Sequence, residues 1–578
     1  MKINYSDEKN VQIIIALLKA HNIKKIIASP GTTNMTFVRS CQNDPFFEIY
    51  SAVDERSAAY IACGLSDESG EPVVLSCTGA TASRNYLPAL TEAYYRKLPI
   101  LSITGSQNIS KIGHLSPQLI DRTVMPKDTV KYSVHLPIVK DNDDFWSNEI
   151  KVNNAILELS RKGGGPVHIN LTTQYSKNFD VQELPKVRVI QRYTISDNLP
   201  KLLESKVAIF VGTHQSMNNK LTQAIDKFCA TYDGVVFCDH TSGYYGKYKV
   251  VHAISSSQRF ADFDNIKPEL TIHIGEISGD ATSKIIGKKI WRVSPDGEIR
   301  DTYRKLQNVF EMNEIEFFNY YAKYGMNNNS YLEECNEHLI NMRKIIPEIP
   351  FSNLWVAQHS HKQIPNNSVM HFGILNSLRS WNFFPLHQTV KSSCNVGGFG
   401  IDGCLSTLIG ASLVEKEKLY FIVLGDLAFF YDMNSIGNRH MGNNVRILLI
   451  NNGIGTEFKN FNHNASTFGK SADDFHAAGG HFGNKSKTLV KNYCENLGFE
   501  YLSASSKDEF EKEYESFFDQ SLKEKPMVLE VFTNDQDESD ALETITSLKT
   551  NAKGKAKDVV RNIIGKDGVN KLKSFLNK

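Results

Sequence analysis

The sequence predicts an α/β protein made of three doubly wound parallel-sheet domains. Two observations lead to this class. Short apolar runs of strand length alternate with stretches of helical spacing along most of the 578 residues, and many of the runs end in glycine or a polar turn. Buried strands separated by helices are typical of parallel sheets covered on both faces. The pattern fills three blocks, at 1–182, 190–345 and 350–545, and leaves a basic tail at 546–578.

The first block begins with a helix and a strand. VQIIIALLKAHNI has helical spacing, and KKIIASPGTTN is expected to be a short strand that ends in a Pro-Gly turn. PVVLSCTGAT and ILSITGS are expected to be buried strands, with the helix RNYLPALTEAYYRKLP between them. A strand in GGGPVHINLTT closes the block.

The second and third blocks repeat this alternation. Strands are expected in VAIFVGTHQS, GVVFCDH, LTIHIGEISG and KIWRVSPDG. The second block has no GxGxxG after its first strand, which argues against a dinucleotide or FAD site there. The third block contains HFGILNSLR, PMVLEVFT and two apolar runs, LYFIVLG and VRILLI, with DMNSIGNRH expected as the helix between those runs. The tail has the pattern of a basic amphipathic helix that either packs on the body or contacts a partner or an anionic surface.

Bulk composition excludes several classes of protein. The net charge of +1 gives no electrostatic reason to expect nucleic acid. Nine scattered cysteines without a CxxC pair suit a reducing compartment. The amino terminus lacks a signal core, and no apolar run approaches the roughly 18 residues that a membrane span needs. We therefore expect a cytoplasmic protein without a membrane span.

Two strand ends in the third block carry polar side chains. Asp426 follows LYFIVLG, and Asn452 follows VRILLI 26 residues later. In a right-handed βαβ unit both carboxyl ends face one edge, so the two side chains can meet there. Their oxygens suit Mg²⁺ bound to a diphosphate, and Gly425 and Gly453 leave room for phosphate oxygens. The alternative is that Asp426 only caps a helix and Asn451–Asn452 form a turn.

A glutamate in the first block completes a known pattern. Glu55, in IYSAVDERSAAYIACGLS, stands between a short strand and a helix of small residues. Alone, it would be expected only to favour the helix amino terminus. Because it carries both this glutamate and the Gly-Asp…Asn-Asn pattern, the chain resembles the thiamine diphosphate-dependent superfamily of 2-oxo acid decarboxylases and carboligases over residues 5–535. The stretches that resemble its menaquinone-pathway carboligases, the SEPHCHC synthases, are SPGTTN, DERSAAYIACGLS, LPALTEAYYRKLPILSIT, GGGPVHINL, IDGCLSTLIGAS and GDLAFFYDMNS.

The resemblance implies a domain order and a set of site residues. The blocks become a pyrimidine-binding, a middle and a pyrophosphate-binding domain of the thiamine diphosphate-binding fold. Glu55 would hydrogen-bond N1′ of the aminopyrimidine, and Gln118 would reach the reacting atoms unless it is simply a solvated loop residue. Ile401 would hold the two cofactor rings in place unless it is a core residue. The implied cofactor contacts are Glu55, Thr78, Gly79, Ile401, Gly425, Asp426, Leu427, Asn452 and Gly453, and the implied Mg²⁺ ligands are Asp426, Asn452 and a backbone carbonyl of Ile454 or Gly455.

The implied activity is that of a carboligase, which decarboxylates a 2-oxo acid and transfers the acyl carbanion to an acceptor. A simple decarboxylase or C–C hydrolase, a SEPHCHC synthase and a non-catalytic scaffold are the alternatives. The first block lacks the adjacent histidine pair frequent in simple decarboxylases. Because Glu55 and the metal site lie on different domains, the resemblance also implies a homodimer or homotetramer with sites built from two chains.

Three positions depart from the menaquinone enzymes. Thr33, Gln107 and Val396 stand where the resemblance places arginines that bind dicarboxylates. Arg379 and Lys391 are nearby in sequence but out of register. The sequence therefore favours a changed acceptor, in a specialised bacterial biosynthetic route such as the formation of modified sugars for a surface polysaccharide.

Overall fold

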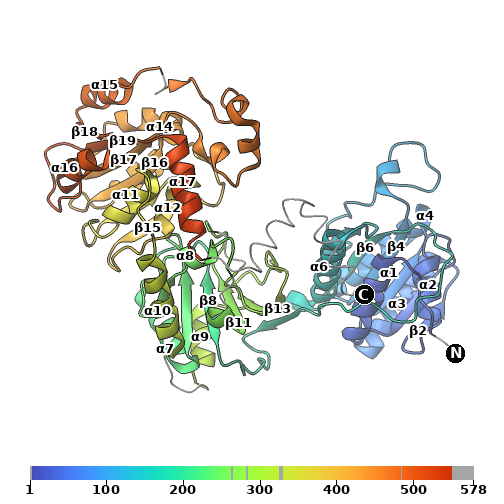
Figure 1. Cartoon of the computed structure of the whole chain (residues 1–578). Coiled ribbons are helices and arrows are strands. Elements are labelled where there is room, and N and C mark those ends of the chain that lie inside the picture. The colour runs from blue at the N-terminus through green and yellow to red at the C-terminus, as the bar shows by residue number, and fades with distance from the viewer. Residues whose placement is uncertain (1–2, 262–263, 281–283, 324–329, 483–484, 550–578) are drawn as a thin grey trace. The chain divides into compact units, whose positions relative to one another are not determined.

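The computed structural model describes residues 3–261, 264–280, 284–323, 330–482 and 485–549 (Figure 1). Residues 550–578, with the helix expected in the basic tail, lie outside the described residues. The chain folds into two compact units. The first holds residues 1–194 and 297–309, and the second holds 195–296 and 310–578.

The first unit is built on a parallel sheet of order β2-β1-β3-β4-β6-β5. From β1 the chain continues to β2 on one side and then to β3 on the other. Open α/β sheets bind ligands where the connections diverge in this way. The strands are β1 (Lys25–Ala28), β2 (Glu48–Ser51), β3 (Val73–Cys77), β4 (Ile100–Ser106), β5 (Tyr132–Leu136) and β6 (Val167–Thr172).

Helices cover both faces of this sheet. Val74 packs into a core with α1, α2 and α6, whereas its neighbours Val73 and Leu75 pack into a second core with α3, α4 and α5. This alternation follows from the two-residue period of a strand. The helices are α1 (Lys9–Ala20), α2 (Met35–Gln42), α3 (Glu55–Ser69), α4 (Thr81–Asn85), α5 (Leu87–Arg96) and α6 (Asn142–Glu158).

The segment 297–309 belongs to the first unit although it is distant in sequence. The Asp301 side chain, which is 0% exposed, accepts hydrogen bonds at 2.8 Å from both Trp146 Nε1 and Arg188 Nη1. Arg188 Nη2 also bonds Glu149 Oε2 at 2.7 Å. Asp301 therefore fastens the returning segment to α6 and to the strand region that follows it.

Replacing Asp301 by Ala is expected to cost on the order of 3 kcal/mol of unfolding free energy, because it leaves the side-chain donors of Trp146 and Arg188 and the backbone N–H groups of Lys305 and Leu306 without this acceptor. Urea unfolding followed by tryptophan fluorescence measures the change. Asp143→Ala is the control, because Asp143 pairs with Arg304 but is 75% exposed, and such pairs contribute about 1 kcal/mol or less. A cost for Asp301→Ala below that of the control would contradict the assignment.

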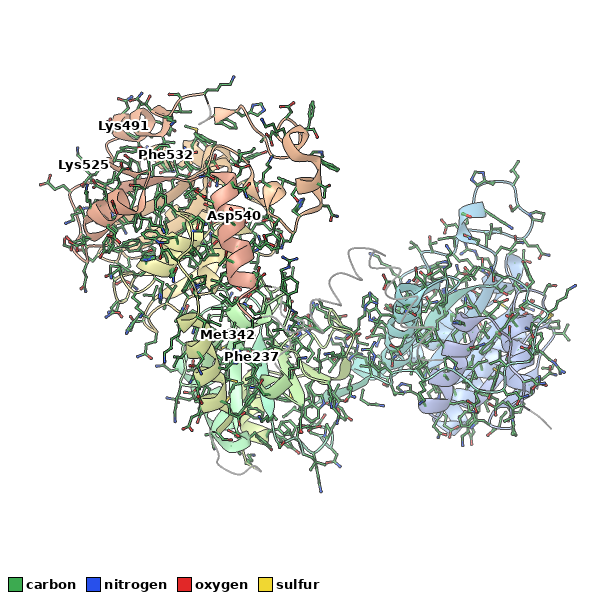
Figure 2. All side chains as sticks on the ribbon, viewed as in Figure 1. Phe237, Met342, Lys491, Lys525, Phe532 and Asp540 are labelled. Atoms are coloured by element: carbon green, nitrogen blue, oxygen red, sulfur yellow. The ribbon has the colours of Figure 1, made fainter. Side chains whose placement is uncertain are left out.

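The second unit contains a middle parallel sheet. Its strands β8 (Val207–Val211), β9 (Gly234–Cys238), β10 (Lys249–Val251), β11 (Leu270–Ile274) and β12 (Lys289–Val293) lie in the order β10-β9-β8-β11-β12. The chain passes between the units after β7 (Gln191–Thr194) and within β13 (Leu306–Glu311). The helices are α7 (Asn219–Tyr232), α8 (Ala253–Ser256), α9 (Glu314–Tyr321) and α10 (Ser330–Lys344). Phe237 of β9 and Met342 of α10, which Figure 2 labels, are both buried, and α10 contacts β9.

A third parallel sheet of order β15-β14-β16-β17-β19-β18 completes the second unit. Its connections diverge between β14 and β16. The strands are β14 (Val369–Phe372), β15 (Lys391–Cys394), β16 (Tyr420–Gly425), β17 (Val445–Asn451), β18 (Glu500–Ala504) and β19 (Met527–Phe532).

Helices also cover both faces of the third sheet. Those of one face, α13 (Cys404–Ser412), α14 (Asp426–Asp432) and α15 (Leu489–Asn496), share a core with β16 and β17. The others are α11 (Asn353–Ser360), α12 (Asn376–Asn382), α16 (Lys507–Phe517) and α17 (Asp535–Thr546). Figure 1 shows α17 running from this sheet toward α8, where Gln258 Nε2 donates to Ile545 O at 2.7 Å.

The expected fold class is confirmed, because all three sheets are parallel and belong to α/β layers. The boundaries at 182, 190, 345, 350 and 545 remain predictions. The helix expected over DMNSIGNRH was wrong in position: α14 begins at Asp426 and a 3₁₀ turn, Met433–Gly437, follows it. Ala428, Phe429 and Phe430 of DLAFFYD are buried on a helix rather than in an extended strand. Within the described residues, every helix is too short or too polar to span a membrane.

Candidate active site

β16 and β17 bring the ends of the Gly-Asp…Asn-Asn pattern together. Gly425, the last residue of β16, pairs with Ile450 near the end of β17. The Asp426 carboxylate accepts hydrogen bonds from the backbone N–H groups of Leu427 and Gly453. Asp426 therefore touches the residue directly after Asn452, at the carboxyl edge of the sheet and next to the divergence point between β14 and β16.

Asp426 is a buried carboxyl group, 4% exposed. Burial raises its pKa to about 7, although the N–H groups of Leu427 and Gly453 act in the opposite direction. A bound cation would relieve the cost of ionising this group. Among the described residues no group of three or more His, Cys, Asp or Glu side chains could hold a metal. One carboxylate, one amide and backbone carbonyls would instead supply the all-oxygen ligand set that Mg²⁺ accepts.

The Asn452 side chain, in the loop after β17, makes only long hydrogen bonds to other residues of that loop among the described residues. Its Oδ1 lies 3.4 Å from the Ile454 N–H nitrogen, and its Nδ2 lies 3.5 Å from Thr456 Oγ1. Gly453 has φ +74°, a left-handed conformation that favours glycine. The Gly455 N–H donates to Ala477 O at 2.6 Å, which fixes the far end of the loop. The Asn452 amide is therefore held near Asp426 without a strong competing partner.

Space for a phosphate group exists above Gly425. A Cβ placed on Gly425 would meet no atom within 4 Å, whereas one on Gly455 would lie 3.3 Å from Leu427 Cδ1. The open side of Gly425 adjoins Asp426, so these residues fit a metal-bound diphosphate. Ile401 is half-buried and packs against the core shared by α13 and α14, which is compatible with both of its expected roles.

Glu55 is the first residue of α3 and is half-buried. The helix is capped by its neighbour, because Asp54 Oδ1 accepts from Ser57 N at 2.8 Å. Glu55 is therefore not needed as the cap. Among the residues that the structure describes, its carboxylate receives one long hydrogen bond, from Asn85 Nδ2 at 3.5 Å.

The loops after β1, β3 and β4 converge at the divergence point of the first sheet. Thr78 Oγ1 lies 2.7 Å from Thr33 Oγ1. A Cβ on Gly79 would lie 2.9 Å from Gln118 O and 3.9 Å from Arg122 Nη1. The structure thus brings Thr78, Gly79 and Gln118 together, with the Gln118 side chain exposed.

The three positions where the resemblance places arginines, Thr33, Gln107 and Val396, hold neutral side chains. Thr33 and Val396 are buried, and Gln107 Oε1 accepts from Lys111 Nζ at 3.1 Å. Arg379 cannot replace the missing charges while it forms two bonds with Glu457, at 2.9 and 3.1 Å. Lys391 begins β15 and so lies at the amino edge of the sheet, opposite the edge that carries Asp426.

Sequence reasoning missed a buried support for the loop after β17. Glu530 of β19 accepts from Asn451 Nδ2 at 2.6 Å and from the Tyr501 hydroxyl at 2.7 Å. Asn451 Oδ1 in turn accepts from the Gly453 N–H at 3.1 Å. The signal was present in PMVLEVFT, where one acid interrupts an apolar strand. Arg122 was also missed, because its loop has no periodic pattern.

The comparisons with known proteins agree with this arrangement. Residues 9–125 match the thiamine pyrophosphate enzyme, N-terminal TPP binding domain. Three similar proteins are 2-succinyl-5-enolpyruvyl-6-hydroxy-3-cyclohexene-1-carboxylate synthases. The one from Bacteroides fragilis (strain ATCC 25285) is 31% identical over 92% of this chain and 97% of its own. Those from Phocaeicola vulgatus and Christiangramia forsetii are 32% identical, over 93% and 98%, and 28% identical, over 92% and 96%. The chain belongs to the family of these synthases, within the thiamine pyrophosphate enzymes.

Proposed function

We propose that this thiamine diphosphate-dependent enzyme is a Mg²⁺-dependent carboligase that forms 2-succinyl-5-enolpyruvyl-6-hydroxy-3-cyclohexene-1-carboxylate. The carrying observation is its similarity to synthases of this product over more than nine-tenths of both chains. This reading takes precedence over the changed acceptor that the sequence alone favoured. The contact between Asp426 and Gly453 and the open space above Gly425 also support it.

The product's name defines the chemistry of both substrates. A succinyl group on the ring requires a donor that keeps four carbons and one carboxylate after losing CO₂, which is 2-oxoglutarate. The rest of the product is a hydroxylated ring with a carboxylate and an enolpyruvyl group, so the acceptor is the matching cyclohexadiene dicarboxylate. One C–C bond to the donor carboxylate breaks, one C–C bond to the ring forms, and one proton is taken up.

The proposed roles of the residues follow from their positions. Bound thiamine diphosphate would supply the electron sink that makes loss of CO₂ feasible. Asp426, Asn452 and a backbone carbonyl of Ile454 or Gly455 would hold the Mg²⁺ that fixes the diphosphate. Glu55 would hold a proton at N1′ of the aminopyrimidine. Gln118, beside Gly79, would orient the reacting substrate.

A changed acceptor is the second candidate. Thr33, Gln107 and Val396 are neutral, and Arg379 is engaged by Glu457. A dianionic ring would then meet fewer charges than the resemblance implies. This candidate alters the second substrate and leaves the metal site and Glu55 in the same roles.

A homodimer or homotetramer is proposed as the functional assembly. Apolar side chains beside Glu55 in the sequence and on α3 and α5 are exposed, with Val53 at 80%, Ile61 at 52% and Tyr95 at 68%. Contiguous exposed apolar residues are typical of protein interfaces. Sedimentation velocity at micromolar concentration would measure the assembly, and a monomer with full activity would contradict it.

A donor screen tests the proposed reaction. The protein is loaded with thiamine diphosphate and Mg²⁺ and is offered 2-oxoglutarate, pyruvate and other 2-oxo acids. We expect CO₂ release from 2-oxoglutarate, faster release with the cyclohexadiene dicarboxylate, and a product of the stated mass. If the cyclohexadiene dicarboxylate does not change the rate of CO₂ release, the result would favour the changed acceptor. No release from any 2-oxo acid would overturn the carboligase proposal.

A further inference from the structure

Arg122 is a buried guanidinium group with unsatisfied donors. The residue is 2% exposed, and its Nη2 donates to Gly105 O at 2.9 Å. Neither Nε nor Nη1 has a hydrogen-bond partner among the residues that the structure describes. Buried donors and buried charges without partners are costly, so such a group is normally paired with an anion.

The charged groups that act on Arg122 do not supply that anion. Among the described residues they are the thiol of Cys77, the guanidinium of Arg84 and the imidazoles of His135 and His168, whose pKa values burial lowers so that both rings are neutral at pH 7. Burial raises the pKa of the Cys77 thiol to about 12, so the thiol is neutral at pH 7. Arg84 carries the same charge as Arg122 and repels it. The cation is therefore uncompensated within its own surroundings.

Arg122 stands where the loops of the first sheet converge. It lies on the connection between β4 and β5 that also carries Gln118. Its Nη1 faces Gly79, at 3.9 Å from the position of a Cβ there, and its Nη2 holds Gly105 of β4. A Cβ on Gly105 would in turn strike Thr33 O at 2.3 Å. The guanidinium thus lies against the ends of β3 and β4, at the edge where sheets of this kind bind ligands.

We infer that Arg122 binds a carboxylate of the substrates and supplies part of the positive charge that Thr33, Gln107 and Val396 lack. Arginine suits this role because its N–H groups make strong charge-assisted bonds to carboxylates. The identity of the anion as a substrate of the carboligase rests on the proposed function, whereas the anion site itself rests on the unpaired guanidinium.

A binding experiment on the holoenzyme tests the anion site without turnover. Glutarate is the non-reacting dicarboxylate probe, and butyrate and chloride are the comparison anions. Glutarate is expected to raise the thermal midpoint of the wild type, and Arg122→Gln is expected to abolish that rise. Without glutarate, Arg122→Gln should unfold at or above the wild-type midpoint, because it removes an uncompensated buried charge. A lower midpoint with the glutarate effect retained would make Arg122 a structural residue and overturn the inference.

Steady-state kinetics with each substrate identify which one supplies the carboxylate that Arg122 binds. CO₂ release from 2-oxoglutarate alone reports on the donor, and product formation with the ring acceptor reports on both substrates. Arg122→Gln is expected to raise the KM of one dianionic substrate about tenfold to a hundredfold, while C2–H exchange stays unchanged. Arg122→Lys should recover part of the loss. Arg96→Gln, which removes a surface charge paired with Asp67, is the control.

The two proposals can fail separately. A glutarate effect that depends on Arg122, in a protein that releases no CO₂, would keep the anion site and overturn the carboligase. KM values of Arg122→Gln within twofold of the wild type for both substrates would overturn the inference and leave the carboligase intact.

Discussion

Glu55→Gln is expected to slow exchange of the cofactor's C2 proton by at least about two orders of magnitude, in the range that a positioned acid or base contributes. Glutamine keeps the size of the side chain and can still contact N1′, but it cannot share a proton with that nitrogen as a carboxyl group does. Affinity for thiamine diphosphate should change little, because other residues are proposed to hold the diphosphate. Quenched-flow deuterium exchange read by NMR, with calorimetry for binding, separates the two effects.

Asp54→Asn is the matched control for Glu55. Asp54 is the adjacent acid and caps α3 through Ser57, so its loss is expected to affect helix stability by about 1 kcal/mol or less and to leave C2–H exchange near the wild-type rate. If Glu55→Gln exchanged the proton as fast as the wild type, the role proposed for Glu55 would be wrong.

Asp426→Asn is expected to weaken Mg²⁺-dependent binding of thiamine diphosphate at least about a hundredfold, since the metal would lose its only carboxylate ligand. Asp432→Asn is the control. Asp432 is a second buried acid of α14, and it accepts from Ser406 N and Ser406 Oγ, both at 2.6 Å. Its loss should lower stability without changing metal affinity. Equal effects of the two substitutions on metal affinity would contradict the assignment.

The pH dependence of metal binding has a defined sign. Burial raises the pKa of Asp426 to about 7, so in the metal-free protein this carboxyl is protonated below that pH. Mg²⁺ requires the carboxylate, and its apparent affinity should rise with pH up to about 7 and then level off. The pKa of Asp426 is higher in the folded than in the unfolded protein. The metal-free protein should therefore lose stability as the pH rises from the unfolded pKa of this group to about 7, and Asp426→Asn should not show this loss. Isothermal titration with Mg²⁺ and urea unfolding at several pH values measure the two trends.

The sequence predicted those parts of the fold whose signals are local. The central strands carry their own apolar runs, whereas edge strands such as β15, with the sequence KSSC, do not. The Gly-Asp…Asn-Asn pattern needs only the topology of one βαβ unit to bring Asp426 near Asn452. The start of α14 was misplaced because AFFY is as compatible with a strand as with a buried helix. Periodicity does not separate the two over such a short run.

Features that depend on distant residues could not be predicted. Asp301 binds Arg188 and Trp146 across more than 100 residues of chain, and no local pattern marks that partnership. The engagement of Arg379 by Glu457 depends on how α12 meets the loop after β17. The burial of Arg122 is equally non-local, because an arginine in a polar loop is normally exposed.

The return of residues 297–309 also has a consequence for biosynthesis. When the ribosome has made the first 194 residues, the first unit still lacks the acid at position 301, and it cannot complete its packing until translation has passed residue 309. During that interval Arg188 and Trp146 of the nascent chain lack Asp301 as their hydrogen-bond acceptor. A fragment that ends at residue 194 would lack Asp301 altogether. We expect this fragment to reach its full resistance to proteases only when the peptide 297–309 is added separately.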